Sequence, residues 1–192
     1  MSGNDPKEKP GKFTYADYLT WPDDERWELI DGVAYDMSPA PGRRHQWILG
    51  KLFRAIADIT DRQGCETYVA PFDVRLAEPG AADDEVTTVV QPDVSVYCGG
   101  DKLDDRGAHD APDLAVEILS PSTSYKDQTH KLARYERAGV REYWIVNGEA
   151  AWVMVYRLQP DGRYGKPDYY EGGERIRSTV LDGEVIAPTS RT

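Results

Sequence analysis

Hydrophobic and polar positions along this chain follow two periods, a helical one in a few stretches and a strand-like one in most others. The clearest helical stretch covers residues 43–63 and is followed by Gly64, a residue that commonly ends helices. Its apolar side chains recur at helical spacing, at Leu49, Leu52, Ile56 and Ile59. We therefore expect an amphipathic helix over residues 43–63.

A second helix is predicted from Ser124 to about residue 138. Ser124 and Asp127 have the spacing of an S-x-x-D capping box, and Gly139 supplies the stop. The segment "FTYADYLTW" predicts a further, short helix that ends before Pro22.

The remaining apolar runs predict strands. "RWELIDGVAYDM" reads as a hairpin that turns at Asp31-Gly32, and "REYWIV" and "AAWVMVY" as a second hairpin around Asn147-Gly148. "CETYVAPFDVRLA" and "VTTVVQPDVSVYC" are strand-rich, and "DLAVEIL" is apolar on both faces, as in a central strand. Together with the helices, these runs predict an α/β fold with a central mixed β-sheet flanked by helices.

Length and composition are those of one globular domain. The chain has 192 residues, 40% hydrophobic and 30% charged. We expect a flexible polar tail over residues 1–12 and one domain over residues 13–188. No stretch has the ~20 consecutive apolar residues of a membrane span, and no secretory signal is seen. Cys65 and Cys98 lack metal-ligand spacing, so we expect reduced thiols and a cytoplasmic protein.

A net charge of −11 argues against a protein that coats nucleic acid nonspecifically, because the phosphates would be repelled on average. Residues 125–141 reverse that balance and could form a local cationic surface. Their basic side chains are Lys126, Lys131, Arg134, Arg137 and Arg141.

Glu117 is the first candidate for chemistry, because it lies inside the apolar run of the predicted central strand. A carboxylate there costs several kcal/mol unless it has a partner. Lys131 is a candidate partner: three residues of strand, about 10 Å, separate Glu117 from Ser120, and seven residues of helix, about 10 Å, separate Ser124 from Lys131. If the helix doubles back along the sheet, Lys131 arrives level with Glu117.

Structural alternatives remain for both residues. Glu117 could form a buried ion pair with an arginine. Lys131 could pair with Asp127 on a solvent-exposed helix face, as residues four apart often do.

Three other polar side chains complete the candidate set. Asp93 follows Pro92 near a predicted strand end, although Pro-Asp is also a common turn dipeptide. His45 is in register with the apolar face of the first long helix, where a hydrogen-bonded core histidine is the alternative. Glu28 stands between apolar neighbours in a predicted strand, and its partner cannot be named from the sequence.

Two acids on neighbouring strands suit a hard cation. Mg²⁺ is typically held by one or two carboxylates and several waters, which leaves room for a phosphate. A metal would polarise the phosphoryl group and activate water, while a lysine oriented that water or neutralised charge. This set favours phosphodiester hydrolysis.

Several segments resemble the Uma2 family of restriction-endonuclease-like proteins, within the PD-(D/E)XK superfamily. They are "WELIDG", "RRHQWILGKL", "FDVRL", "QPDVSV" and "DLAVEILSPSTSYKDQTHKLARYERAGVREYWIV". The resemblance runs over about residues 14–157. It implies a restriction-endonuclease-like core, a Mg²⁺-dependent nuclease site in which Mn²⁺ can substitute, and nucleic acid, DNA first, as the partner.

Residue by residue, the resemblance puts the PD motif on Asp93 and the (D/E) position on Glu117. Both would be metal ligands, together with the backbone carbonyl of Ile118. The motif's lysine position holds Leu119, so the family's lysine would be Lys131 on the following helix.

The same resemblance places His45 and Glu28 near the site, with Gln91 and Asp73 as neighbours. The catalytic set is thus Asp93, Glu117, Lys131, His45 and Glu28.

The sequence therefore leads to two hypotheses. The first is a Mg²⁺-dependent endonuclease that hydrolyses DNA, expected to be a homodimer that offers two sites to a duplex. The alternative, favoured by Leu119 and the acidic charge, is a catalytically inactive nuclease-fold module for nucleic-acid binding or assembly. Aromatic side chains of the late hairpin either pack in the core or form the dimer surface: Tyr143, Trp144, Trp152 and Tyr156.

Overall fold

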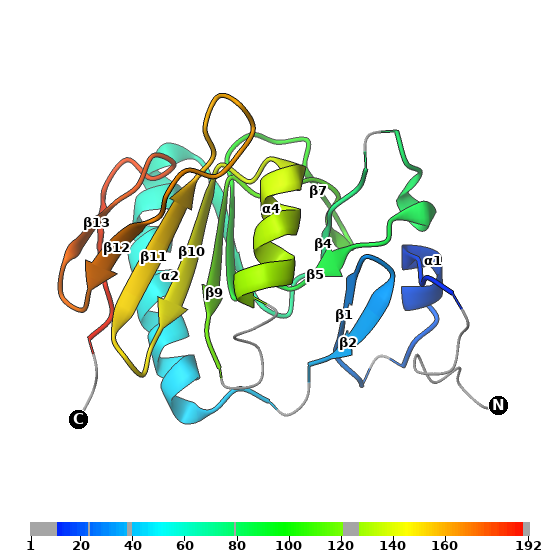
Figure 1. Cartoon of the computed structure of the whole chain (residues 1–192), viewed down its shortest axis with the longest axis horizontal. Helices are drawn as coiled ribbons and strands as arrows, with labels where there is room; N and C mark the ends of the chain where they lie inside the picture. The colour runs from blue at the N-terminus through cyan, green and yellow to red at the C-terminus, as the bar shows by residue number, and fades with distance from the viewer. Residues whose placement is uncertain (1–10, 23, 38–39, 79, 121–126, 190–192) are drawn as a thin grey trace.

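A mixed six-stranded sheet, here called the central sheet, organises the fold (Figure 1). The computed structural model describes residues 11–22, 24–37, 40–78, 80–120 and 127–189. Strand order is β12-β11-β10-β9-β6-β3, and only β9 and β10 run parallel among these neighbours. The strands are β3 (Glu66–Val69), β6 (Val94–Tyr97), β9 (Leu114–Ile118), β10 (Glu142–Asn147), β11 (Trp152–Arg157) and β12 (Asp168–Glu171).

A second six-stranded sheet lies beside the central one, with α1 at its far side (Figure 1). Its order is β2-β1-β5-β4-β8-β7. The strands are β1 (Trp27–Ile30), β2 (Val33–Asp36), β4 (Val74–Arg75), β5 (Val89–Val90), β7 (Leu103–Asp104) and β8 (Gly107–Ala108). A separate hairpin joins β13 (Arg175–Arg177) to β14 (Glu184–Ile186). The predicted α/β fold with a central mixed sheet is confirmed, and so are both predicted hairpins.

Helices cover both faces of the central sheet. The long predicted helix is α2 (Arg43–Gln63), which ends at Gly64 in a left-handed conformation with φ 70°. On the opposite face, one π-helical turn, η3 (Asp127–Lys131), leads into α4 (Leu132–Ala138), which ends at Gly139 (Figure 1). Ser124 of the predicted capping box lies outside the described residues. The short predicted helix is α1 (Tyr15–Tyr18), and η2 (Asp83–Glu85) is a 3₁₀ turn.

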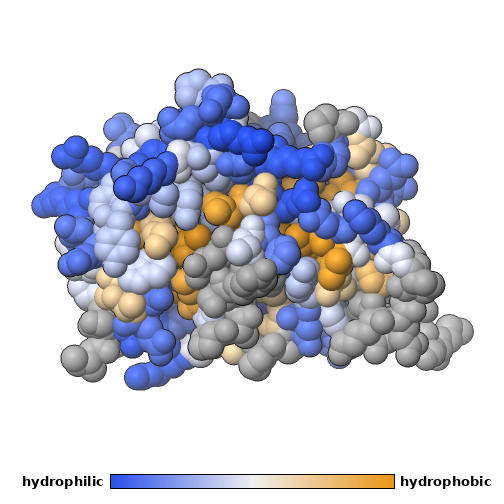
Figure 2. Space-filling view, viewed as in Figure 1, coloured by the Kyte–Doolittle hydropathy of each residue, from blue (hydrophilic) through white to orange (hydrophobic). Residues whose placement is uncertain are grey.

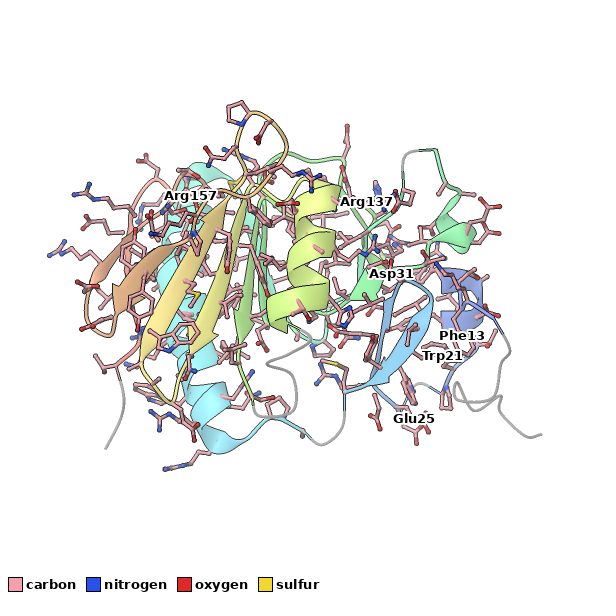
Figure 3. All side chains as sticks on the ribbon, in the orientation of Figure 1. Phe13, Trp21, Glu25, Asp31, Arg137 and Arg157 are labelled. Carbon is pink, nitrogen blue, oxygen red and sulfur yellow. A yellow bond between two sulfur atoms is a disulfide. The ribbon has the colours of Figure 1, made fainter. Side chains whose placement is uncertain are left out.

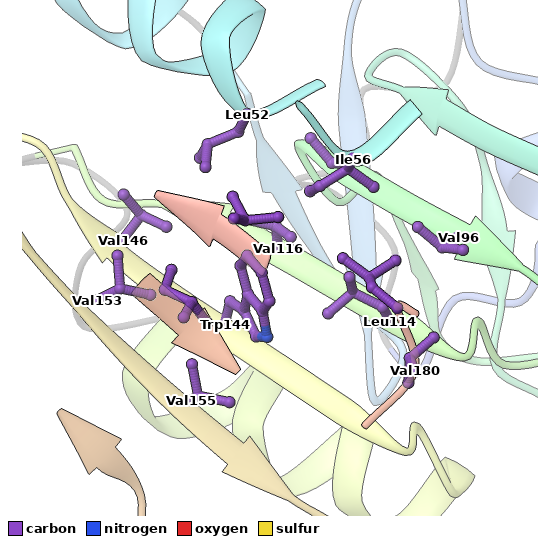
Figure 4. Close-up of a cluster of buried hydrophobic side chains, with 14 of the residues drawn as sticks. Leu52, Ile56, Val96, Leu114, Val116, Trp144, Val146, Val153, Val155 and Val180 are labelled. Carbon is purple, nitrogen blue, oxygen red and sulfur yellow. The ribbon is translucent and has the colours of Figure 1, made fainter. Parts of the chain in front are cut away.

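Strand β9 is buried on both faces, as the apolar run predicted. One face contributes Leu114 and Val116 to a core that α2 covers with Leu52 and Ile56 (Figure 4). The other face contributes Ala115 to a separate core beneath α4, with Tyr135. A strand enclosed in this way has no water for Glu117, so its carboxylate needs partners within the protein.

The aromatic side chains of the late hairpin belong to these cores. Tyr143 and Trp144 are fully buried, and Trp152 and Tyr156 pack against the α4-side core while partly exposed. Core packing is therefore the correct alternative for this hairpin. The homodimer stays a prediction.

Cys65 and Cys98 form a disulfide, which corrects the expectation of reduced thiols. The reason is topological. Strands β3 and β6 pair antiparallel, with Glu66 opposite Tyr97, so the residues just outside that pair also meet. A separation of 33 residues along the chain gave no sign of this contact.

The described basic side chains of residues 125–141, which could form a local cationic surface, have acidic partners. Arg134 pairs with Asp31 at the β1–β2 turn, beside α4 (Figure 3). The other pairs are Arg137 with Glu78, Arg141 with Asp113, and Lys131 with the residues of the site below. Lys126 lies outside the described residues.

The surface in Figure 2 carries apolar side chains in separate patches divided by hydrophilic ones. Among the described helices, none is both long and apolar enough to cross a bilayer.

Candidate active site

Lys131 connects the two sheets through two carboxylates. Its Nζ lies 2.7 Å from Oε1 of Glu117 on β9 and 2.7 Å from Oε1 of Glu28 on β1. All three side chains are almost completely buried. The helix that follows β9 thus brings Lys131 level with Glu117, as predicted. The partner of Glu117 is this lysine rather than an arginine.

Tyr135 is a functional neighbour that the sequence analysis did not select. Its hydroxyl donates to Oε1 of Glu117 over 2.8 Å, so Lys131 and Tyr135 bind the same carboxylate oxygen. The two donors lie four residues apart, one turn along the helix. The i, i+4 spacing from Lys131 could have identified Tyr135 from the sequence, because Lys131 was already expected on the helix face toward the sheet.

Glu28 is held in place from its own side of the site. The backbone N–H of Gln91 donates to Oε1 of Glu28 over 2.9 Å. The Gln91 amide in turn donates to Oδ1 of Asp73 over 2.8 Å, and Tyr18 donates to the same oxygen over 2.9 Å. The network fixes the carboxylate that Lys131 meets on the second sheet, and it places Gln91 and Asp73 as neighbours of the site.

Burial dominates the protonation behaviour at the outer end of this network. It raises the pKa of Asp73, against the hydrogen bonds from Gln91 and Tyr18, which lower it. Burial also raises the pKa of Tyr18, and the adjacent Asp73 carboxylate raises it further. Tyr18 therefore remains a protonated donor to Asp73.

Asp93 stands at the end of the β6–β9 ladder. The last paired residues are Val94 and Val116, so Asp93 and Glu117 occupy the next positions on adjacent strands. Oδ2 of Asp93 accepts the backbone N–H of Ile118 over 2.7 Å. It also lies 3.2 Å from Nε2 of His45, in the first turn of α2. His45 therefore borders the site instead of packing into the core.

The charges and donor atoms of the site suit a hard cation. Glu28, Glu117 and Asp93 supply three carboxylates against the single ammonium of Lys131, which leaves an excess of negative charge. Carboxylate and carbonyl oxygens are the ligands that Mg²⁺ takes, and one or two carboxylates are usually enough. No group of three or more His, Cys, Asp and Glu side chains is placed to hold a metal within the described ranges.

Leu119 occupies the strand position at which the resemblance expects a lysine. The amine of the site, that of Lys131, comes from a helix instead. Leu119 follows β9 and packs against the apolar core beneath α4. An aliphatic side chain at that position fills space but supplies no charge. Lys131 reaches the carboxylate from the opposite layer, so the structure has the ammonium in the site without a lysine on the strand.

A pocket of about 500 Å³ opens beside Asp93. It lies between the N-terminal end of α2, the end of β9 and the β10–β11 turn. His45 and Ile118, which both contact Asp93, line it. The cavity therefore adjoins the residues that contact Asp93, while Glu28 and Glu117 stay buried.

Comparison with known proteins agrees with this fold. The family model described as "Uma2: Putative restriction endonuclease" matches residues 15–189. The "Uncharacterized protein slr1290" of Synechocystis sp. (strain ATCC 27184 / PCC 6803 / Kazusa) is 26% identical over 167 residues, 84% of this chain and 83% of that protein. A crystal structure described as a "putative nuclease belonging to DUF820", from Anabaena variabilis ATCC 29413, has a similar fold. Its TM-score is 0.68 at 19% identity, over 86% of this chain and 89% of that one.

Proposed function

Because the chain belongs to the Uma2 family, we propose that it is a Mg²⁺-dependent endonuclease that hydrolyses phosphodiester bonds in DNA. The observation that carries the proposal is the position of Asp93 and Glu117 at adjacent strand ends, with Lys131 2.7 Å from Glu117. Two acids and an ammonium, close to residues that line a cavity, are groups that phosphodiester hydrolysis uses.

Asp93, Glu117 and the backbone carbonyl of Ile118 would hold the Mg²⁺, and Mn²⁺ would substitute. All three supply hard oxygen donors. When bound, the ion polarises the phosphoryl group and lowers the pKa of a coordinated water.

The surrounding side chains would orient the attacking water and neutralise the charge on the phosphoryl group. Lys131 would position the attacking water or offset the negative charge that develops on the phosphoryl oxygens. His45 holds Asp93 through the 3.2 Å contact of its Nε2. Glu28 is a positioning residue, since it acts on the site through Lys131.

Conservative substitutions test this assignment. We expect Asp93→Asn and Glu117→Gln to abolish Mg²⁺-dependent cleavage of DNA while the thermal unfolding midpoint shows a folded protein. Glu136→Gln is the matched control, because Glu136 contacts Arg163 and Tyr164 away from the site. If both site variants cleave as fast as the wild-type protein, the assignment is wrong.

One observation favours the alternative of a catalytically inactive binding or assembly module. Oε1 of Glu117 already accepts hydrogen bonds from Lys131 and Tyr135. Calorimetric titration with Mg²⁺ or Mn²⁺ separates the two functions. An enzyme gives a binding heat that Glu117→Gln abolishes, whereas an inactive module gives no heat that depends on Glu117.

A further inference from the structure

The pocket beside Asp93 has walls of two kinds. Ile48, Ile118 and Leu119 contribute apolar side chains to the lining, while Arg44, His45 and Asn147 contribute polar groups. Its volume of about 500 Å³ is in the range of small-molecule sites, which run from about 300 to 1,000 Å³. A hydrated ion alone would gain nothing from the apolar side. The occupant that suits both walls has an anionic part and an apolar part.

Arg44 supplies the cationic side of this pocket. One terminal guanidinium nitrogen, Nη2, is buried and has no hydrogen-bond partner within the described chain. A buried N–H that is left without an acceptor is unfavourable, so a ligand oxygen that reached this nitrogen would recover that loss. Arg44 also lies in the first turn of α2, a 21-residue helix whose N-terminal end attracts anions.

The first three turns of α2 extend this positive charge along the surface. Residues 43–54 contain no acidic side chain. At about 100° per residue their four basic side chains fall within about a third of the helix circumference. Among the described residues none of the four forms an ion pair, in contrast to Arg134, Arg137 and Arg141. The four are Arg43, Arg44, Lys51 and Arg54.

We propose that this pocket binds one unpaired nucleotide of the substrate strand, with its phosphate on Arg44 and its base against Ile48, Ile118 and Leu119. The strand then follows the basic side chains of α2. The inference rests on the proposed function for the identity of the ligand and deepens it, because it makes the preferred substrate single-stranded or locally unpaired DNA. A base that stays paired in a duplex cannot enter a cavity of this size.

Binding without cleavage provides the test. Fluorescence anisotropy would measure the affinity of the wild-type protein for a short labelled single-stranded DNA and for a hairpin duplex of the same sequence, both in EDTA. We expect the single strand to bind more tightly. Arg44→Gln should weaken single-strand binding about tenfold or more, because a buried charge-assisted contact is lost. Its effect on the duplex should be small.

Arg43→Gln is the matched control. It removes the same charge from the adjacent, exposed position outside the pocket lining. Because an exposed charge contributes little, we expect a loss of about two- to threefold. Glu149→Gln should have the opposite effect and strengthen binding, since Glu149 is the acidic side chain in the pocket lining.

Equal losses in Arg43→Gln and Arg44→Gln would overturn the inference, and so would equal effects of Arg44→Gln on both DNAs or no binding of single strands. These outcomes leave the endonuclease assignment to be judged separately, by the cleavage rates of Asp93→Asn and Glu117→Gln.

Discussion

Lys131 and Glu117 are 14 residues apart in the chain, yet Nζ of the lysine lies 2.7 Å from Oε1 of the glutamate inside the protein. The contact forms because η3 and α4 pack on one face of the central sheet, over β9. Two buried charges of this kind are expensive to desolvate and are stable only as a pair. Removing one member therefore has a predictable cost.

We expect Lys131→Met to lower the free energy of unfolding by about 3–5 kcal/mol, because it leaves Glu28 and Glu117 as buried, unneutralised carboxylates. Urea denaturation measures the change. Adding Glu28→Gln to Lys131→Met should restore part of the lost stability. A cost below about 1 kcal/mol, the size typical of an exposed pair, would contradict the buried ion-pair interpretation.

Tyr135→Phe tests the second donor to Glu117. The substitution keeps the ring, which packs at a tilt against Tyr143, but removes the hydroxyl that donates to Oε1 of Glu117. We expect a loss of about 1–2 kcal/mol in unfolding free energy, because a hydrogen bond to a charged group is lost. Tyr164→Phe is a control with a hydroxyl bonded to the neutral carbonyl of Val140, and it should cost less. The prediction holds if Tyr135→Phe lowers the unfolding free energy more than Tyr164→Phe does, and it is wrong if the order is reversed.

Local sequence signals were enough to predict the helices and hairpins. Helix α2 was predicted to its end residues, because its apolar positions and Gly64 depend only on neighbours in the chain. The contact of Lys131 with Glu117 was also accessible, since strand and helix rises fix how far each residue lies from the turn between them.

Features that depend on contacts between residues far apart in the chain could not be predicted from the sequence. The Cys65–Cys98 disulfide follows from the β3–β6 register, and the partners of Arg134 and Arg137 come from the second sheet and its loops. Glu28 had no nameable partner for the same reason: its contact with Lys131 forms only when the two sheets are side by side.

The ionisation of Asp73 should be visible in the pH dependence of the free energy of unfolding. Its pKa in the folded protein is raised above the ordinary value of 3.8, so the folded state binds more protons than the unfolded state in that range. The contribution of Asp73 to the free energy of unfolding therefore falls as the pH rises from about 3.8 through the pKa of Asp73 in the folded protein. We expect Asp73→Asn to flatten this fall and to be the more stable form at neutral pH.

Denaturant titrations from pH 4 to pH 8 would measure the effect, with Asp105→Asn as an exposed control. An Asp73→Asn protein that follows the wild-type pH profile in parallel would contradict the assignment.

Gly107 is required by a close backbone approach. Its φ is +119°, and a Cβ there would lie 2.3 Å from the backbone oxygen of Asp73. Gly107→Ala should therefore lower the unfolding free energy by about 3 kcal/mol, from both strain and overlap. Gly162→Ala separates these causes, because Gly162 has φ +78° with open space around it, and we expect about 1 kcal/mol. Similar losses in thermal melts of the two variants would show that the overlap contributes nothing.

Glu28 and Glu117 come from different sheets, and one ammonium holds both. A nascent or partly unfolded chain in which only one sheet has formed cannot assemble this trio. On the proposed function, such a chain would be harmless to the nucleic acid around it. On that proposal, hydrolytic competence would require both sheets to be folded and packed against each other.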